Sequence, residues 1–230
     1  YPMYLGHMDI DAHAYSLKGL QEAILKQPDS TQKSSLQDHL GYGLEYVISE
    51  ASYNQLRASI GKDPIELGPD GIGLYTSMKD DRAFTDLLEH TLKSRPEVSV
   101  DGQDYRLVPE LYSDNVVADR EITLYIAFIV PDEKYLAWTK DGQEPFCWNM
   151  TVSQEAVDEL GLMQAIQKVD ERLSSTGLEY ESYLSGIGRN LFYTVASSYL
   201  SIYLGVLFLL ISNTVIGLKY LMQQHACRQR

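Results

Sequence analysis

Residues 190–218 read NLFYTVASSYLSIYLGVLFLLISNTVIGL, a run of twenty-nine residues without one Asp, Glu, Lys or Arg. At about 1.5 Å of rise per residue, a helix of this length extends roughly 43 Å, enough for the hydrocarbon core of a bilayer and its headgroup zones. A buried core helix is the alternative, but such helices seldom run past about twenty residues without a charged face. We therefore predict a transmembrane helix over residues 190–220.

The flanks of this stretch indicate its orientation. Tyrosines, whose amphipathic rings favour the membrane interface, lie near both ends, at positions 193, 199, 203 and 220. Residues 219–230 contain three basic residues and no acidic one. Because cytoplasmic flanks are enriched in Lys and Arg, we expect a cytoplasmic segment over residues 221–230 and an extracellular location for residues 1–189.

The extracellular part is strongly acidic. All 32 acidic residues but only 16 of the 19 basic ones lie in residues 1–189, which gives this part a net charge of −16. A negative surface attracts cations and cationic peptides and repels nucleic acid, although it also simply keeps a domain soluble. We expect no nucleic-acid partner.

The cysteines and the start of the chain bear on its cellular context. Cys147 and Cys227 are expected on opposite sides of the membrane, so no intramolecular disulfide is expected. The chain opens without a basic leader and apolar run of the signal-peptide type. Since an extracellular domain still requires export, we expect these residues to be a piece of a longer polypeptide with earlier membrane segments.

The patterning of residues 1–177 predicts a mixed α/β extracellular domain. Apolar residues at helical spacing, with capping and breaking residues at the ends, predict helices over residues 16–27, 49–60, 80–93 and 153–175. Alternating or continuous apolar runs predict strands within residues 4–15, 44–48, 72–75, 121–130 and 145–152. Asp101 and Gly102 predict a type I′ turn in a hairpin over residues 98–108.

Two of these strand-helix units resemble each other. VISEASY at residues 47–53 aligns with IVPDEKY at residues 129–135, and each reads as a buried strand, a capping or first-turn residue, an acid and a helical Tyr. Internal duplication is one interpretation, and chance similarity is the other.

The predicted helix over residues 153–175 carries an apolar stripe at helical spacing, formed by Val157, Leu160, Met163, Ile166, Val169 and Leu173. Such a stripe favours packing on a sheet over a groove for a partner. Gly177 is expected to end this helix, and residues 178–189 to form a juxtamembrane neck.

Patterns that indicate chemistry are sparse. His7, Asp9, Asp11 and His13 alternate as on one strand face, which could suit a divalent metal, but four side chains along an extended strand do not converge and a solvated face has the same pattern. The sequence has no GxxxxGK[ST], GxSxG, HExxH or CxxC motif. We expect no metal site, no catalytic site and no cofactor in this chain.

The predicted membrane helix has a small-residue face. Ser197, Ser201 and Gly205 recur every four residues, and Asn213 and Gly217 continue the spacing two turns on. Small residues let another helix approach closely, so this face favours helix packing. The alternative is that Ser and Gly are simply common in membrane helices.

These same residues carry a resemblance to a known family. The run SSYLSIYLGVLFLLISNTVIGLKYLMQQ, at 197–224, resembles the first helix after the large extracellular domain of FtsX-like permeases in bacitracin-export-type (Bce-type) ABC transporters of Gram-positive bacteria. YVISEASYNQL and IVPDEKYLAW are similar to strand-helix segments of that domain. The tail HACRQR departs from the family, which usually carries acids among the bases there.

The resemblance implies a permease subunit that is multi-pass in its full length. It also implies ATP hydrolysis on a separate ABC ATPase subunit and, in part of the family, a membrane histidine kinase as a further partner. The implied ligand is a cationic peptide antibiotic or its lipid-linked cell-wall precursor, and the implied role is transport, peptide sensing and antibiotic resistance.

No motif assigns the ligand-binding residues. In the neck, Tyr180 and Tyr183 are the aromatic candidates and Glu179 and Glu181 the acidic ones, while an ordinary solvated neck is the alternative. Two other functions stay open for the whole chain. One is a single-pass receptor or adhesion ectodomain, and the other is a different FtsX-like permease, for lipoprotein release or cell-division control.

Overall fold

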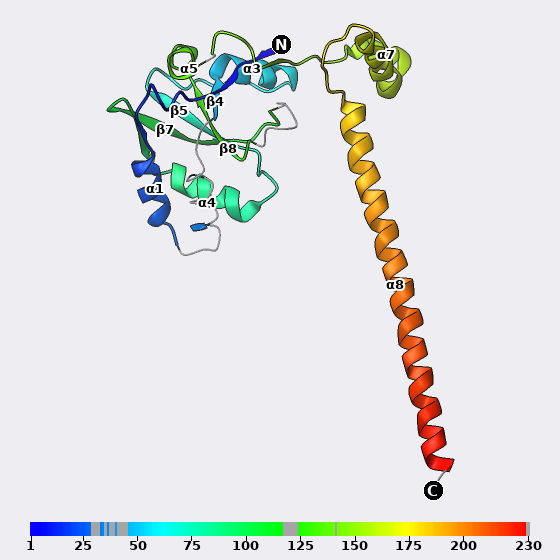
Figure 1. The fold of residues 1–230 in the computed structure, drawn as a ribbon. Helices are drawn as coiled ribbons and strands as arrows, with labels where there is room; N and C mark the ends of the chain where they lie inside the picture. Colours follow the sequence, from blue (N-terminus) through cyan, green and yellow to red (C-terminus); the bar gives the residue numbers. More distant parts are fainter. Residues whose placement is uncertain are drawn as a thin grey trace. The chain divides into compact units, whose positions relative to one another are not determined.

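The computed structural model divides the chain into two compact units, which are described separately (Figure 1). The N-terminal unit comprises Tyr1–Thr151 and the C-terminal unit Val152–Arg230. The structure describes residues 1–28, 33–34, 36, 40, 46–116, 124–140 and 142–228, without the side chains of 183–192, 221 and 223–228. The sequence-based domain boundaries after residues 177, 189 and 220 remain predictions.

A mixed sheet forms the N-terminal unit. Over the described residues its strand order is β2-β4-β8-β5-β7-β6-β3. The strands are β2 (Leu5–His7), β3 (Tyr15–Ser16), β4 (Tyr46–Ser49), β5 (Gly71–Thr76), β6 (Glu97–Val100), β7 (Gln103–Tyr112) and β8 (Ile126–Val130). β4 and β8 are parallel, as are β5 and β7, whereas β5 and β8 are antiparallel. A separate antiparallel pair joins β1 (Pro2–Met3) and β9 (Cys147–Trp148).

Helices cover both faces of this sheet (Figure 1). Among the described residues, the helices of the unit with complete bounds are α1 (Lys18–Leu25), α3 (Glu50–Ser59), α4 (Arg82–Leu92) and α5 (Asp132–Trp138). On one face α1 and α4 enclose a core with strand residues such as Leu74 and Phe128. On the other face α3 packs on the alternate strand residues Tyr75 and Ile129. All five residues of β8 are buried, as expected for a strand covered on both faces.

The short connection between the two edge strands shows that the sheet must curl. Only seven residues, 8–14, join β2 to β3. Seven strands about 4.8 Å apart make a flat sheet roughly 29 Å wide, more than such a short segment spans when it contains a turn. The predicted strand over residues 4–15 is therefore wrong beyond His7. The chain turns there because the backbone carbonyl of Asp9 accepts hydrogen bonds from the N–H groups of Ala12 and His13.

The two predicted strand-helix units are confirmed as β4-α3 and β8-α5, and they lie side by side. Ile48 of β4 is in register with Ile129 of β8. Ser49 caps α3 by accepting a hydrogen bond from the Ser52 N–H (3.3 Å), and its hydroxyl donates to Asp132 Oδ1 in the first turn of α5 (2.5 Å). Whether the two units arose by duplication remains a prediction.

Other local predictions are also confirmed. The hairpin is formed by β6 and β7, with Asp101 at φ +52° and Gly102 at φ +78°, the two positive values that a type I′ turn requires. The predicted helix over residues 80–93 is α4, capped by Asp81. The central strands begin or end close to the predicted positions, except that residues 44–45 and 121–123 of the predictions lie outside the described residues.

The C-terminal unit contains three described helices, α6 (Gln154–Leu160), α7 (Leu162–Ser174) and α8 (Tyr183–Arg228). The single helix predicted over residues 153–175 is wrong, because Gly161 adopts a φ of +78° and separates α6 from α7. Of the predicted apolar stripe, Ile166 is buried but Met163 and Val169 are exposed. The break at Gly161 therefore splits the stripe between two helices.

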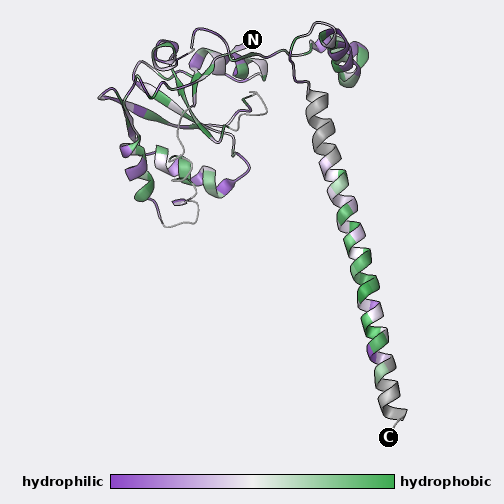
Figure 2. Ribbon diagram, viewed as in Figure 1, coloured by the Kyte–Doolittle hydropathy of each residue, from purple (hydrophilic) through white to green (hydrophobic). Residues whose placement is uncertain are grey.

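The long helix α8 contains the uncharged apolar segment of residues 190–218 (Figure 2). Its span Tyr193–Tyr220 has 28 residues and is long and apolar enough to cross a membrane, and the described residues leave its most apolar window unburied. At about 1.5 Å per residue, the 46 residues of α8 extend roughly 69 Å. The helix begins at Tyr183, so only residues 178–182 of the predicted neck are non-helical after Gly177.

Candidate functional site

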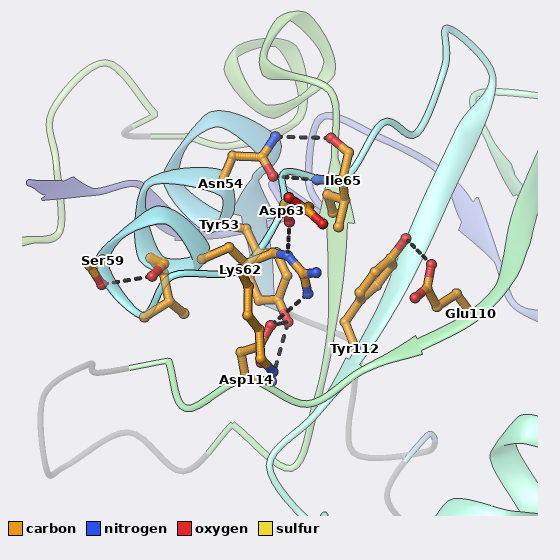
Figure 3. A network of polar contacts seen from close by, with 11 residues as sticks. Tyr53, Asn54, Ser59, Lys62, Asp63, Ile65, Glu110, Tyr112 and Asp114 are labelled. Carbon is orange, nitrogen blue, oxygen red and sulfur yellow. Dashed lines mark hydrogen bonds and ion pairs between the residues drawn. The ribbon is translucent and has the colours of Figure 1, made fainter.

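The most connected polar cluster described in the N-terminal unit surrounds Asp114 (Figure 3). Tyr53 and Arg57 lie one turn apart on α3, so both reach the same carboxylate after β7. Asp114 Oδ2 accepts hydrogen bonds from Tyr53 Oη (3.0 Å) and from Arg57 Nη1 (2.8 Å), and Lys62 Nζ forms an ion pair with Oδ1. The side chain of Asp114 is only 6% exposed.

The loop that follows α3 is held by the same helix (Figure 3). Arg57 Nε donates to the backbone carbonyl of Asp63 (2.6 Å). Asn54 forms two hydrogen bonds with the backbone of Ile65, one to its carbonyl (3.0 Å) and one from its N–H (2.7 Å). Glu50 accepts from the Leu67 N–H (3.1 Å). These side chains satisfy backbone groups that have no ladder partner in the loop.

Burial and charge set the protonation states in this cluster. Burial raises the pKa of Asp114, but the hydrogen bonds from Lys62 and Tyr53, with the charges of Lys62 and Arg57, outweigh it, so the pKa of Asp114 is lowered. Burial raises the pKa of Tyr53 and, with the nearby charge of Glu110, raises the pKa of Tyr112 to about 12. At neutral pH an ionised carboxylate therefore meets two cations and a neutral phenol.

The arrangement suits a structural role, in which Asp114 connects the end of β7 to α3 and to the loop that follows α3. Both carboxylate oxygens of Asp114 are occupied by donors, and these donors come from α3 and from the loop after it. This cluster was not predicted from the sequence. Asp114 lies 52 to 61 positions from Tyr53, Arg57 and Lys62 along the chain, so no local spacing could have identified the cluster.

The predicted ligand-binding residues lie between α7 and α8. Tyr180 is 38% exposed, and its hydroxyl donates to the backbone carbonyl of Asp170 in α7 (3.1 Å). Glu179 and Glu181 are exposed. Tyr183 is the first residue of α8, but its side chain lies outside the described residues. The structure thus ties Tyr180 to α7, and the binding role of all four residues remains a prediction.

The predicted helix-packing residues all lie on α8. At about 100° per residue, each four-residue step rotates the side chain by roughly 40°, so Ser197, Ser201 and Gly205 share one face while Asn213 and Gly217 lie around the helix from it. Ser201 Oγ donates back to the carbonyl of Ser197 (2.9 Å). A Cβ placed on Gly205 or Gly217 would meet nothing within 4 Å. The faces are open, and their packing role remains a prediction.

The alternating His and Asp residues do not form one face, because the chain turns after His7. The ring of His7 packs against Tyr46, with centroids 4.2 Å apart. His13 Nδ1 lies 2.7 Å from Asp101 Oδ2, which raises the pKa of His13 and lowers that of Asp101 through their hydrogen bond. Among the residues that the structure describes, no group of three or more His, Cys, Asp or Glu could hold a metal ion.

Comparison with known proteins adds no relative. No protein-family model, no curated protein and no solved structure matches the chain. The regions to weigh for function are therefore those of the chain itself: the acidic N-terminal unit, the segment between α7 and α8, and the apolar span of α8.

Proposed function

We propose that this chain is part of the membrane permease subunit of an FtsX-like ABC transporter of the bacitracin-export type. In this proposal α8 crosses the cell membrane, residues 1–189 are extracellular and residues 221–230 are cytoplasmic. The extracellular part binds or senses a cationic peptide antibiotic or its lipid-linked cell-wall target. A partner ABC ATPase subunit hydrolyses ATP and moves the helix, and a membrane histidine kinase is a further candidate partner.

The observation that carries this proposal is the continuity of α8. The helix begins at Tyr183, ten residues before the apolar span Tyr193–Tyr220. At about 1.5 Å per residue, these extra turns extend the helix roughly 15 Å beyond the span. A continuous helix transmits displacement along its axis. Movement of the membrane segment would therefore reach the residues that link α7 to α8. This supports a mechanical output.

Charge and geometry near the start of α8 support a cationic ligand. Residues 1–189 carry a net charge of −16, which draws cations toward this part of the chain. Glu179 and Glu181 flank Tyr180, whose hydroxyl is fixed on Asp170. Asp170 Oδ1 is buried and has no hydrogen-bond partner in the described structure. A buried acceptor without a donor is costly, so Asp170 adds a further negative charge beside Tyr180 without a described partner for this oxygen.

The faces of α8 support a multi-pass protein. Ser197, Ser201 and Gly205 form an open small-residue face, the type through which membrane helices approach each other closely. Asn213 adds a polar amide within the span, and polar side chains at membrane depth usually face protein or water rather than lipid.

A single-pass receptor or adhesion protein is the second candidate. It is favoured by one observation, namely that the described residues contain one candidate membrane span. The parent reading frame separates the two candidates. Several apolar spans of about twenty residues on both sides of this chain would indicate a permease, whereas a signal peptide with this single span would indicate a receptor.

The full-length protein allows a direct functional test. Deletion of residues 1–189 should abolish resistance to cationic peptide antibiotics while the ATPase subunit still co-purifies with the truncated protein. Unchanged resistance would contradict the proposal. A sharper version removes two charges, Glu179→Gln with Glu181→Gln, and measures binding of a labelled cationic peptide. The matched control, Glu155→Gln with Glu159→Gln on α6, removes the same charge elsewhere and should leave binding close to that of the wild type.

A further inference from the structure

A short stripe of large apolar side chains lies exposed around β9. Phe146, Trp148 and Met150 are 41%, 68% and 69% exposed, while the intervening residues Cys147 and Asn149 are half-buried. Because side chains alternate along an extended chain, the three exposed residues project from the same side. They form the β9 stripe, which no part of the site described above includes.

The backbone of the stripe is fixed by β1. Trp148 is in register with Pro2 in the β1-β9 pair. The Phe146 N–H donates to the carbonyl of Met3 (2.9 Å), and the Asn149 N–H donates to that of Tyr1 (2.8 Å). The stripe is therefore a positioned surface, and its exposure does not come from a loosely attached loop.

Its composition sets the stripe apart from the rest of the unit. Trp138, the other tryptophan of the chain, is 5% exposed and packs against Tyr105 at 5.1 Å between centroids. The ten residues 145–154 carry no charge, although residues 1–189 together have a net charge of −16. Apolar side chains exposed together on a soluble unit usually mark a surface that contacts something else.

We propose that the β9 stripe rests in the interfacial zone of the membrane that α8 crosses. This inference depends on α8 being a membrane helix, but not on the transporter assignment. A bilayer is then present for this chain, and Trp is the side chain most typical of the membrane-water interface, with Phe and Met supplying apolar contact. Anionic headgroups repel an acidic surface. They do not repel residues 145–154, because these residues carry no charge.

Other occupants fit the stripe less well. A cationic peptide would need carboxylates interleaved with the apolar side chains, and residues 145–154 contain none. A second copy of the chain would need a larger surface, since stable protein interfaces use about 20 to 30 residues on each side. Insertion of three side chains among lipid headgroups requires neither interleaved carboxylates nor a large protein interface.

The two tryptophans provide the test. The full chain is reconstituted in nanodiscs of phosphatidylcholine, either plain or brominated near the headgroup end of the acyl chains, which quenches nearby tryptophans. Trp138→Phe leaves Trp148 as the single reporter, and Trp148→Phe leaves the buried Trp138. We expect brominated lipid to reduce the emission of Trp148 about twofold, as for an interfacial ring, and to leave that of Trp138 nearly unchanged. Should Trp138→Phe disturb the core, the wild type compared with Trp148→Phe reports the same difference.

Each other result overturns the proposal. Equal emission of Trp148 in plain and brominated discs would place the stripe away from the lipid. Emission that shifts only when a cationic amphipathic peptide is added would make it a peptide surface, and a shift that depends on protein concentration would make it a contact between copies. A chain that fails to enter nanodiscs would remove α8 from the membrane as well. The assay contains no ATPase and no antibiotic. Its outcome therefore does not depend on whether the transporter proposal is correct.

Discussion

Large apolar side chains are buried in the N-terminal sheet but exposed on helix α8. Phe128 lies in β8 and is 2% exposed, because helices cover both faces of the sheet. Phe208 lies in α8 and is 70% exposed, in a span of which nothing is buried by the chain. Periodic apolar residues of the sheet pack into a core, whereas the described residues do not bury the most apolar part of the continuous uncharged run. This difference is expected if, as proposed, water surrounds the N-terminal unit and lipid surrounds the apolar span of α8.

The same substitution in both regions should give the largest contrast. Phe128→Ala removes a ring from the core and is expected to lower the free energy of unfolding of the N-terminal unit by about 3–5 kcal/mol. Phe208→Ala is expected to leave it unchanged. Urea unfolding followed by the emission of buried Trp138 measures both. A comparable loss for the two variants would break the contrast, because it would mean that α8 contributes to the same core.

A charge within the span should oppose membrane insertion. Leu207→Arg places a guanidinium near the middle of Tyr193–Tyr220 and is expected to make insertion about 2.5–3.5 kcal/mol less favourable. An insertion assay that scores the membrane-integrated fraction provides the measurement, with Leu207→Ala as the uncharged control. Equal insertion of the arginine and alanine variants would show that this part of α8 does not meet hydrocarbon.

The Asp114 cluster should stabilise the N-terminal unit by an intermediate amount that depends on pH. Asp114→Asn removes the charge that two cations and a phenol contact, and should cost the N-terminal unit about 2 kcal/mol at neutral pH. Because the folded-state pKa of Asp114 is lowered, its stabilisation is present above the ordinary aspartate value of about 3.9 and is lost as the pH falls through the lowered pKa.

Urea midpoints measured from neutral pH down to the acid range check this prediction. The wild type and the asparagine variant should converge at low pH. Glu89→Gln, on the exposed surface of α4, is the matched control and should retain the wild-type profile. A constant gap between Asp114→Asn and the wild type at all pH values would exclude titration of this carboxylate as the cause.

Helix caps should give the smallest effect and again distinguish the two units. Ser49 caps α3 and Ser153 caps α6, each accepting one backbone hydrogen bond at 3.3 Å. Ser49→Ala should destabilise the N-terminal unit by about 1 kcal/mol. Ser153→Ala, the same change in the C-terminal unit, should not move the urea midpoint reported by Trp138. A shift for both would indicate that the two units unfold together.

Local features of the fold could be predicted because their causes lie within a few residues. The Ser49 cap, the type I′ turn at Asp101 and Gly102, and α8 each depend on residue types that are adjacent or periodic in the sequence. The Gly161 break was missed although the signal was present. A glycine within a helical pattern is usually tolerated, and nothing local shows that it adopts a positive φ.

Features that depend on distant residues could not be predicted. The curled sheet follows from the pairing of β3 with β6, and the Asp114 cluster depends on Asp114 lying more than fifty positions from its three partners. The β9 stripe lay in a predicted strand, but its exposure became evident only when β1 was paired with it. The binding role predicted for Tyr180 and its neighbours remains a prediction, and the contact of Tyr180 with Asp170 was not predicted from the sequence.

The curl of the sheet also affects how copies of this chain can meet one another. Its outermost strands, β2 and β3, contain only three and two residues, and the same seven-residue segment ends one and starts the other. Neighbouring molecules therefore find little unpaired backbone on which to add a strand of their own. The short edges of the curled sheet are therefore expected to disfavour edge-to-edge polymerisation.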